Sequence, residues 1–228
     1  VWDVSAERQV QIKGLDASRL VQWMTPRDIS PAQDDQCFYL PLCDEQGKLI
    51  NDPIGIKIDE STWWLSIADS DVMLWAKGLA AGKGLDVTIT EPNVCPVAVQ
   101  GPKAETLMQR VFGDEIPGIR FFRYKRLPYK GHEFIVARSG WSKQGGFEVY
   151  IDNAKLGQAL WDELFEVGED LNVGNGSPNL IERIESGLMS FGNDMDYRHT
   201  PLECGLEKFC NLDSDLNSMS LAALRRQR

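Results

Sequence analysis

The segment from Arg138 to Tyr150 reads RSGWSKQGGFEVY, and it is the most informative stretch of the chain. Its glycines predict a turn that leads into a short strand over residues 146–151. Side chains two residues apart on a strand point to the same face, so Glu148 and Tyr150 should lie side by side. A carboxylate and a phenol placed together can hydrogen-bond the donors and acceptors of a flat heterocycle. The stretch therefore predicts a strand whose Glu148–Tyr150 face could form a ligand site.

Strand-like and helix-like patterns alternate along the rest of the chain without a regular strand–helix–strand repeat, which is typical of an α+β fold with mostly antiparallel sheet. Strands are predicted around Val10 and at 36–43, 48–58, 62–68, 85–90, 94–100, 119–123, 126–130 and 132–138. Helices are predicted after Asp16, after Asp69 and Asp71, and at 103–112, 154–167 and 179–190. The apolar face of the helix after Asp71 is expected to consist of Val72, Leu74, Trp75 and Leu79.

The chain has 228 residues, enough for one large domain or two small ones. A new strand–helix pattern begins near Pro92, which predicts a boundary there. We expect a first α+β lobe over residues 1–91 and a second over 92–212. Residues 213–228 are expected to begin a further segment.

Composition excludes several functional classes. The net charge of −10 argues against a nucleic-acid surface and against adhesion to an anionic membrane. No apolar run approaches the ~20 residues of a transmembrane helix. The five cysteines are odd in number and irregularly spaced, which favours a reducing cytoplasm over a disulfide framework. With two histidines and no Cys-x-x-Cys pair, the chain lacks the ligand set typical of a zinc site.

Asp52 is the first candidate for a catalytic residue. It lies in an otherwise apolar segment, Leu49 to Ile54, where a carboxylate is costly to desolvate unless something binds it. Pro53 removes a backbone donor and leaves the strand locally open. The alternative is a structural role, in which the aspartate lies next to a turn and accepts hydrogen bonds from backbone amides. When the residue is considered alone, this structural role is the more common one for a buried polar side chain.

Several motifs together resemble the glycine-cleavage aminomethyltransferase (T-protein) family. The matching segments, which follow the family's order, are WDVS at 2–5, GKLINDP at 47–53, VAVQGPKA at 97–104, SGWSKQGGFE at 139–148 and PLECGL at 201–206. Within this family the demethylases of dimethylsulfoniopropionate share further segments, which are NDP at 51–53, WLSIADSD at 64–71, SKQGGFE at 142–148 and PNLIERIE at 178–185.

The resemblance implies a fold of two ferredoxin-like lobes that binds tetrahydrofolate. It implies a catalytic role for Asp52 and places Tyr39, Ser66, Glu148 and Tyr150 around the folate. Without it, Tyr39 and Tyr150 could be ordinary strand aromatics and Ser66 a polar gap in a strand.

The implied reaction is methyl transfer from a small sulfonium substrate, dimethylsulfoniopropionate, to tetrahydrofolate. The alternatives are an aminomethyltransferase of glycine cleavage, against which Asn51 counts, and a folate-binding module without turnover. The resemblance also implies that the chain is an internal fragment without the family's C-terminal barrel domain, and that this fragment is inactive by itself. It is compatible with a homodimer.

Overall fold

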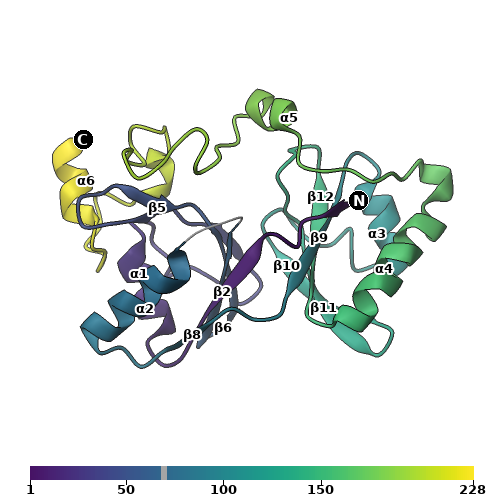
Figure 1. The fold of residues 1–228 in the computed structure, drawn as a ribbon, viewed down its shortest axis with the longest axis horizontal. Coiled ribbons are helices and arrows are strands. Elements are labelled where there is room, and N and C mark those ends of the chain that lie inside the picture. Colours follow the sequence, from purple (N-terminus) through teal and green to yellow (C-terminus); the bar gives the residue numbers. More distant parts are fainter. Residues whose placement is uncertain (68–70) are drawn as a thin grey trace. The chain divides into compact units, whose positions relative to one another are not determined.

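The computed structural model describes residues 1–67 and 71–228 (Figure 1). The chain forms two compact units, and each unit consists of two separate segments. The Asp52 unit comprises Arg8–Pro92 and Met189–Arg228, and the Glu148 unit comprises Val1–Glu7 and Asn93–Leu188. The change of unit after Pro92 adjoins the expected boundary at 91/92. The units differ from the expected consecutive lobes because residues 1–7 belong with the later sheet and residues 189–228 with the earlier one.

The Asp52 unit is built on a five-stranded antiparallel sheet with the strand order β3-β6-β7-β2-β8. Its strands are β2 (Arg8–Lys13), β3 (Cys37–Tyr39), β6 (Ile54–Asp59), β7 (Thr62–Ile67) and β8 (Thr88–Thr90). A separate two-stranded sheet pairs β4 (Leu42–Cys43) with β5 (Leu49–Asn51). The helical elements are α1 (Ala17–Met24), α2 (Val72–Lys83), the 3₁₀ turn η2 (Glu207–Phe209) and α6 (Leu221–Gln227).

The two faces of this sheet have different environments. Val10, Ile12 and Leu65 are buried in one core cluster together with the inner sides of α1 and α2. Residues of the opposite parity point away from these helices. Tyr39, Ile54 and Ser66 pair across β3, β6 and β7 and therefore form a row on the helix-free face.

The Glu148 unit repeats this plan with the strand order β1-β9-β12-β11-β10. Its strands are β1 (Trp2–Asp3), β9 (Cys95–Gln100), β10 (Tyr124–Tyr129), β11 (His132–Ala137) and β12 (Gly146–Ile151). Its helical elements are α3 (Ala104–Phe112), α4 (Ala154–Val167), η1 (Glu169–Leu171) and α5 (Leu180–Glu185). Val97, Phe147 and Val149 pack in one core with α3 and α4. Glu148 therefore points to the helix-free face.

Some expected elements differ from the observed ones. Residues 119–123 contain no strand; they form turns with Phe122 in the left-handed region, at φ 58°. The expected hairpin of 36–43 with 48–58 is divided, because its inner parts form the separate β4–β5 sheet and its outer parts become β3 and β6. The turn at 44–47 between them is present, since Asp44 accepts the backbone N–H groups of Gln46 and Lys48.

Two helices also differ from expectation. In α2, Val72, Ala76 and Ala80 are buried, and Trp75 and Leu79 pack partly buried against the same core. Leu74 is 64% exposed, so the expected apolar face was wrong at this residue. α5 ends at Glu185 instead of continuing to about 190, because Gly187 takes a left-handed conformation and its N–H bonds the carbonyl of Ile184.

The expected helix caps were partly wrong as well. Neither Asp16 nor Asp71 makes a side-chain cap bond, and Asp16 instead accepts the N–H of Asp86 at 2.9 Å. Asp69 lies outside the described residues.

The end of the chain folds onto the Asp52 unit. Leu212, Leu221 and Leu224 are buried together, and the Gln227 side chain donates to the Gln46 carbonyl at 3.0 Å. A Cβ at Gly47 would come within 2.9 Å of Leu224, so this turn needs glycine both for its φ of 81° and for the contact with α6.

Candidate functional site

Asp52 and Tyr39 form a hydrogen-bonded pair at the end of the first sheet. The Tyr39 hydroxyl donates to the Asp52 carboxylate at 2.9 Å. Strand pairing explains the contact, because Tyr39 is opposite Ile54 and the Leu40 N–H bonds the Pro53 carbonyl at 2.9 Å. The chain thereby holds Asp52 beside the Tyr39 ring. The two residues that sequence analysis selected separately are thus brought together.

Burial changes the acid–base behaviour of this pair. Desolvation raises the pKa of Asp52 to about 7, and the hydrogen bond from Tyr39 opposes the rise by favouring the carboxylate. Burial, and then the nearby Asp52 charge, raise the pKa of Tyr39. Tyr39 therefore remains a neutral donor, while Asp52 gains or loses a proton near neutral pH. Such a carboxyl is suited to general acid–base chemistry.

Aromatic and basic side chains surround Tyr39 on its other sides. The Phe209 ring lies 4.7 Å away, centroid to centroid. Arg27 donates from Nη1 to the Tyr39 carbonyl at 2.7 Å, and its guanidinium lies 4.7 Å from the Phe38 ring and 5.2 Å from the Phe209 ring. These contacts restrict the orientation of the phenol, so the Asp52 carboxylate has a fixed donor.

Asn51 supports Asp52 from the adjacent position. It is 4% exposed, and its side-chain oxygen accepts the N–H of Asp52 at 2.8 Å. This bond shapes the backbone immediately before Pro53. Asn51 therefore has a structural role in addition to distinguishing this sequence from the T-protein pattern.

Glu203 of the PLECGL segment has a structural role. Its carboxylate accepts the Thr200 N–H at 2.7 Å and pairs with Lys48 at 3.3 Å. The segment also contributes Cys204, which interacts electrostatically with Tyr39 and Asp52. It therefore forms part of the surroundings of the Asp52–Tyr39 pair.

Ser66 is the next-to-last residue of β7 and is 7% exposed. It is opposite Ile54, which is itself opposite Tyr39, so Ser66 and Tyr39 share a face with one strand between them. The sequence-predicted residues Tyr39, Asp52 and Ser66 thus gather at one face of the Asp52 unit.

Glu148 and Tyr150 point to the same face of β12, as the alternation of strand residues predicts. Glu148 is 8% exposed, and its carboxylate accepts hydrogen bonds from the hydroxyls of Ser139 and Tyr150. Burial raises the pKa of Glu148, and these two donors oppose the rise. A buried carboxylate with ordered hydroxyl donors can accept hydrogen bonds from a flat ligand.

Gln100 fixes the loop that supports Glu148. Its Nε2 donates to the carbonyls of Ser139 and Phe147 at 3.1 and 3.3 Å, and its Oε1 accepts the Ser142 hydroxyl at 2.8 Å. A Cβ at Gly140 would overlap the Gln100 amide at 2.1 Å. The glycine-rich stretch therefore forms a turn and also leaves space for the Gln100 side chain to pack closely against its backbone.

Three residues near Glu148 were not predicted from the sequence: Gln100, Ser139 and Glu7. Glu7 follows β1 in the chain, and the charge of Glu148 contributes to raising the pKa of Glu7 after burial. Gln100 belongs to the VAVQGPKA segment at 97–104. A polar side chain at the end of an apolar strand could have indicated its role. Glu7 gave no such signal, since a glutamate in a polar stretch is most often an ordinary surface residue.

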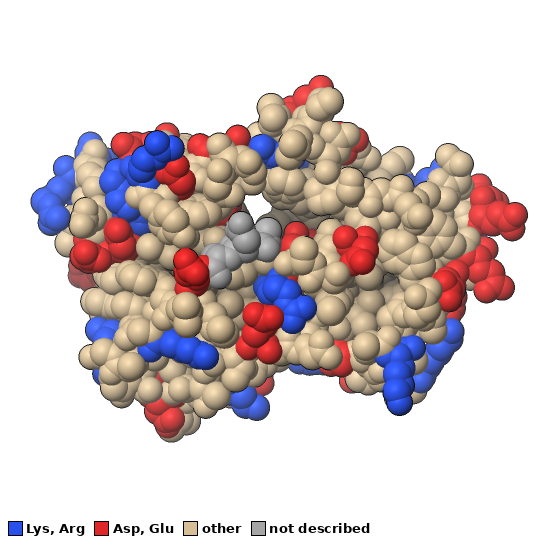
Figure 2. Space-filling view, in the orientation of Figure 1, with Lys and Arg blue, Asp and Glu red and all other residues tan. Residues whose placement is uncertain are grey.

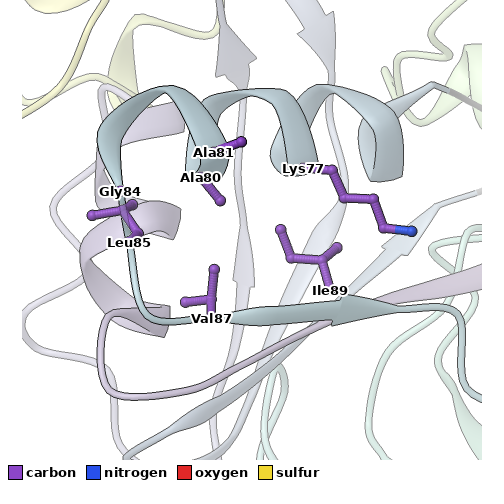
Figure 3. A pocket seen from close by; sticks show the side chains of 7 residues that line it. All are labelled: Lys77, Ala80, Ala81, Gly84, Leu85, Val87 and Ile89. Carbon is purple, nitrogen blue, oxygen red and sulfur yellow. The ribbon is translucent and has the colours of Figure 1, made fainter.

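A cavity of about 260 Å³ lies elsewhere in the Asp52 unit, between α2 and β8 (Figure 3). It is mostly apolar, and it does not include Tyr39, Asp52 or Ser66. Its lining residues are Lys77, Ala80, Ala81, Gly84, Leu85, Val87 and Ile89. The cavity therefore lies apart from the site residues that the sequence predicts in this unit.

Charges on the described residues are mixed. On the face in Figure 2, basic side chains alternate with acidic and uncharged ones. None of the five cysteines, all of which lie in the described ranges, is part of a disulfide. Within residues 1–67 and 71–228, no three His, Cys, Asp or Glu side chains converge as metal ligands. None of the helices in these ranges has the length and apolar content needed to cross a membrane.

The family model described as the GCVT N-terminal domain matches residues 1–214. The chain belongs to this family. The GCVT N-terminal domain assignment confirms the resemblance inferred from the motifs.

This GCVT chain is similar along its whole length to two kinds of enzyme. It is 54% identical over 227 residues to the dimethylsulfoniopropionate demethylase DmdA of Ruegeria pomeroyi. It is 30% identical over 236 residues to an aminomethyltransferase of Alkaliphilus oremlandii. The chain spans 62% and 63% of the lengths of these relatives.

A solved structure supports the fold of this GCVT chain. The glycine cleavage system aminomethyltransferase T of Bartonella henselae superimposes with a TM-score of 0.86 at 19% identity. The match covers 99% of this chain and 62% of the other. The expected α+β fold of the T-protein family is thereby confirmed.

Proposed function

We propose that the full-length protein transfers a methyl group from dimethylsulfoniopropionate to tetrahydrofolate. The products are 3-methylthiopropionate and 5-methyltetrahydrofolate. The observation that carries this proposal is the 54% identity to the demethylase DmdA across the whole chain, compared with 30% to the aminomethyltransferase. A cytoplasmic location and a homodimer remain predictions.

The helix-free face of β12 suits the heterocycle of tetrahydrofolate. That ring presents an N–H and an amino group side by side, and an ionised Glu148 offers two acceptor oxygens. Tyr150 and Ser139 hold the carboxylate in place through their hydroxyls. Glu148 and Tyr150 therefore bind and orient the cofactor in this proposal, and Ser66 and Tyr39 contribute polar groups to its site.

Asp52 handles the proton of the reaction. Tetrahydrofolate supplies a secondary amine, N5, that accepts the methyl group. The sulfonium C–S bond breaks, an N–C bond forms, and the N–H proton must leave. Asp52, with a pKa of about 7, can accept this proton and return it to solvent. Tyr39 acts through Asp52 by holding the carboxylate at 2.9 Å.

This chemistry requires little else from the protein. A sulfonium already has a neutral leaving group, so the protein has mainly to align the two reactants, and alignment is a large part of catalysis. The proposal therefore needs no covalent intermediate on the chain.

A parallel assay tests the proposal. Full-length protein is incubated anaerobically with tetrahydrofolate and, in separate reactions, dimethylsulfoniopropionate, dimethylglycine or aminomethyl-lipoyl protein. We expect 5-methyltetrahydrofolate from the sulfonium alone. Turnover of the lipoyl substrate only would establish the aminomethyltransferase alternative, and folate binding without any turnover would establish a binding module.

Variants connect the activity to Asp52. Asp52→Asn keeps the shape and removes the proton acceptor, so turnover should fall by about 10²-fold or more. Asp162→Asn is the matched control, because Asp162 is exposed on α4. If Asp52→Asn has near-normal turnover, Asp52 is a structural residue.

A further inference from the structure

The cavity of about 260 Å³ between α2 and β8 lies apart from the Asp52–Tyr39 pair (Figure 3). β8 is the last strand in the order of its sheet and pairs with β2, so the cavity opens at the border of the sheet. Two of its lining residues, Ala80 and Ile89, are each 7% exposed and belong to the core of the Asp52 unit. The core therefore fixes the floor of the cavity, whereas exposed residues form its rim.

Small residues on α2 leave this volume open. The connection from α2 to β8 is short, because the Leu85 N–H bonds the Ala80 carbonyl at 3.0 Å and the Val87 N–H bonds the Leu85 carbonyl at 3.0 Å. These bonds hold the end of the helix close to the strand. The lining on the helix side nevertheless includes Ala80, Ala81 and Gly84, which have at most a methyl group as side chain. The space that a longer side chain would fill is thus available to a ligand.

The lining is apolar except at one end. Leu85, Val87 and Ile89 line the strand side, and the polar residues between them do not, as alternation along an extended chain requires. Of the described residues that line the cavity, Lys77 alone is charged. Figure 3 shows its side chain running beside Ile89, with the ammonium at the end of the cavity away from Leu85. The cavity therefore has an apolar end and a cationic end.

The ammonium of Lys77 can pair with a negatively charged ligand. Lys77 is exposed on α2, and among the described residues no carboxylate forms an ion pair with it. A cation beside an apolar wall complements an anion that carries an apolar chain. A cationic ligand would find no counter-charge in this lining, and an unpaired charge among apolar groups is costly.

The volume limits the size of the ligand. A water molecule takes up about 30 Å³ of the liquid, so 260 Å³ corresponds to roughly eight or nine groups of that size. Sites for drug-sized ligands are larger, at about 300–1,000 Å³. A carboxylate with a chain of about four to six atoms therefore matches the cavity in size as well as in charge.

We propose that the cavity is a second ligand site, which binds a short-chain monocarboxylate with its apolar chain between α2 and β8 and its carboxylate on the ammonium of Lys77. The chain lies against Ala80, Val87 and Ile89, which are in place before the ligand arrives. Because the ion pair forms at the exposed rim, binding should weaken as the salt concentration rises.

The product of the proposed reaction, 3-methylthiopropionate, belongs to this class, because its chain is a neutral thioether that ends in a carboxylate. Dimethylsulfoniopropionate has the same carboxylate, but its sulfonium would lie among apolar walls without a counter-charge. The site should therefore select the product over the substrate. The class of ligand follows from the cavity itself, and only this choice of natural ligand rests on the proposed function.

NMR spectra of the full-length protein with labelled alanine, isoleucine and valine methyl groups test the assignment. The methyl signals of Ala80, Val87 and Ile89 report binding at this cavity directly, whatever binds elsewhere. The protein is titrated separately with 3-methylthiopropionate, pentanoate, 1-pentanol and dimethylsulfoniopropionate. We expect both simple carboxylates to shift the three signals with a Kd of about 1 mM, which ligands of this size can reach. The alcohol and the sulfonium should bind there at least roughly fivefold more weakly.

Variants separate the contributions of charge and volume. Lys77→Gln removes the cation from an exposed position, so the Kd of both carboxylates should rise roughly three- to tenfold while that of 1-pentanol stays constant. The matched control is Lys155→Gln, because Lys155 is exposed on α4 in the other unit. Val87→Phe should abolish the shifts of Ala80 and Ile89, since Val87 points across the cavity toward α2 in Figure 3. If Val87→Phe does not fold, Lys77→Gln decides the question.

The outcomes distinguish this inference from the proposed function. If neither carboxylate shifts the three signals up to about 20 mM, the cavity is not a ligand site. If 1-pentanol binds as tightly as pentanoate, or Lys77→Gln leaves the Kd of the carboxylates unchanged, Lys77 does not recognise a carboxylate. If dimethylsulfoniopropionate binds there as tightly as the thioether, the site does not select the product. Pentanoate binding without demethylation would contradict the proposed function alone, and demethylation without these shifts would contradict this inference alone.

Discussion

The hydroxyl of Tyr39 donates to the carboxylate of Asp52 at 2.9 Å, and both groups belong to one turn-and-strand arrangement around Pro53. The donor favours the ionised form of a carboxyl whose burial favours the neutral form. The balance holds the Asp52 pKa near neutrality. Most exposed aspartates are fully ionised at that pH and are weak bases, so burial, partly offset by the Tyr39 hydrogen bond, is what makes Asp52 useful for proton transfer.

Removing the Tyr39 hydroxyl should therefore raise the pKa of Asp52 further. In Tyr39→Phe the carboxylate loses a donor, and the lower limb of the kcat/KM pH profile should move to higher pH by about 0.5–1 unit. The ring contact with Phe209 is retained. A profile that stays in place while the rate falls would mean that Tyr39 acts on the substrate instead of on Asp52.

Asp52→Asn should stabilise the folded protein at alkaline pH. The folded-state pKa of about 7 lies above the ordinary aspartate value of 3.8, so the folded protein binds more protons than the unfolded chain between these values. The stability of the wild type therefore falls as pH rises from about 4 to about 7. The asparagine side chain cannot ionise, so the variant should be more stable at pH 8 by about 4 kcal/mol.

Urea unfolding at pH 4 and pH 8 measures this difference. At pH 4 the two proteins should be close in stability, because Asp52 is then largely neutral in the folded state. A variant that is less stable than wild type at both pH values would contradict the view that Asp52 carries a desolvation cost.

Glu148→Gln should weaken tetrahydrofolate binding by about 1–3 kcal/mol, the scale of a lost hydrogen bond to a charged group. The matched control is Glu133→Gln on the neighbouring strand β11. Glu133 is exposed near the start of β11, whereas the residue opposite Glu148 is at the end of that strand. Calorimetric titration at pH 7 compares the three proteins. Equal affinities for wild type and Glu148→Gln would remove Glu148 from the site.

Gly146→Ala should destabilise the protein by about 2 kcal/mol or more. A Cβ there would lie 2.4 Å from the Val99 carbonyl oxygen and 2.6 Å from Gln100 Nε2, so the backbone of β9 or the Gln100 side chain would have to move. Gly78→Ala is the control. Gly78 lies in α2 with open space around it, and alanine there should stabilise by about 0.5–1 kcal/mol.

Thermal or urea unfolding of both glycine variants checks these signs. Folate affinity of Gly146→Ala should fall together with stability, since Gln100 also positions Ser139 beside Glu148. A Gly146→Ala protein with unchanged stability and affinity would show that the loop does not depend on the Gln100 contacts.

The amino-acid sequence by itself determined the α+β class, most strand and helix positions and the shared face of Glu148 and Tyr150. These follow from local rules, because side-chain alternation and helical spacing act over a few residues. The helix over 154–167 was predicted to the residue. Motif resemblance selected Asp52 and Tyr39 at positions where composition alone favoured ordinary structural roles.

Only the tertiary structure decided the long-range relationships. Strand pairing brought the Tyr39 hydroxyl to the carboxylate of Asp52, which is 13 residues away in the sequence. Pairing of β1 with β9 brought the first residues of the chain to the later sheet. Leu74 remains exposed although its pattern predicted burial, and Leu180, Ile181 and Ile184 of α5 are exposed as well, because a helix buries only the face that finds a partner. The pKa values of Asp52 and Glu7 depend on the same process, since desolvation and a neighbouring charge arise only when distant segments meet.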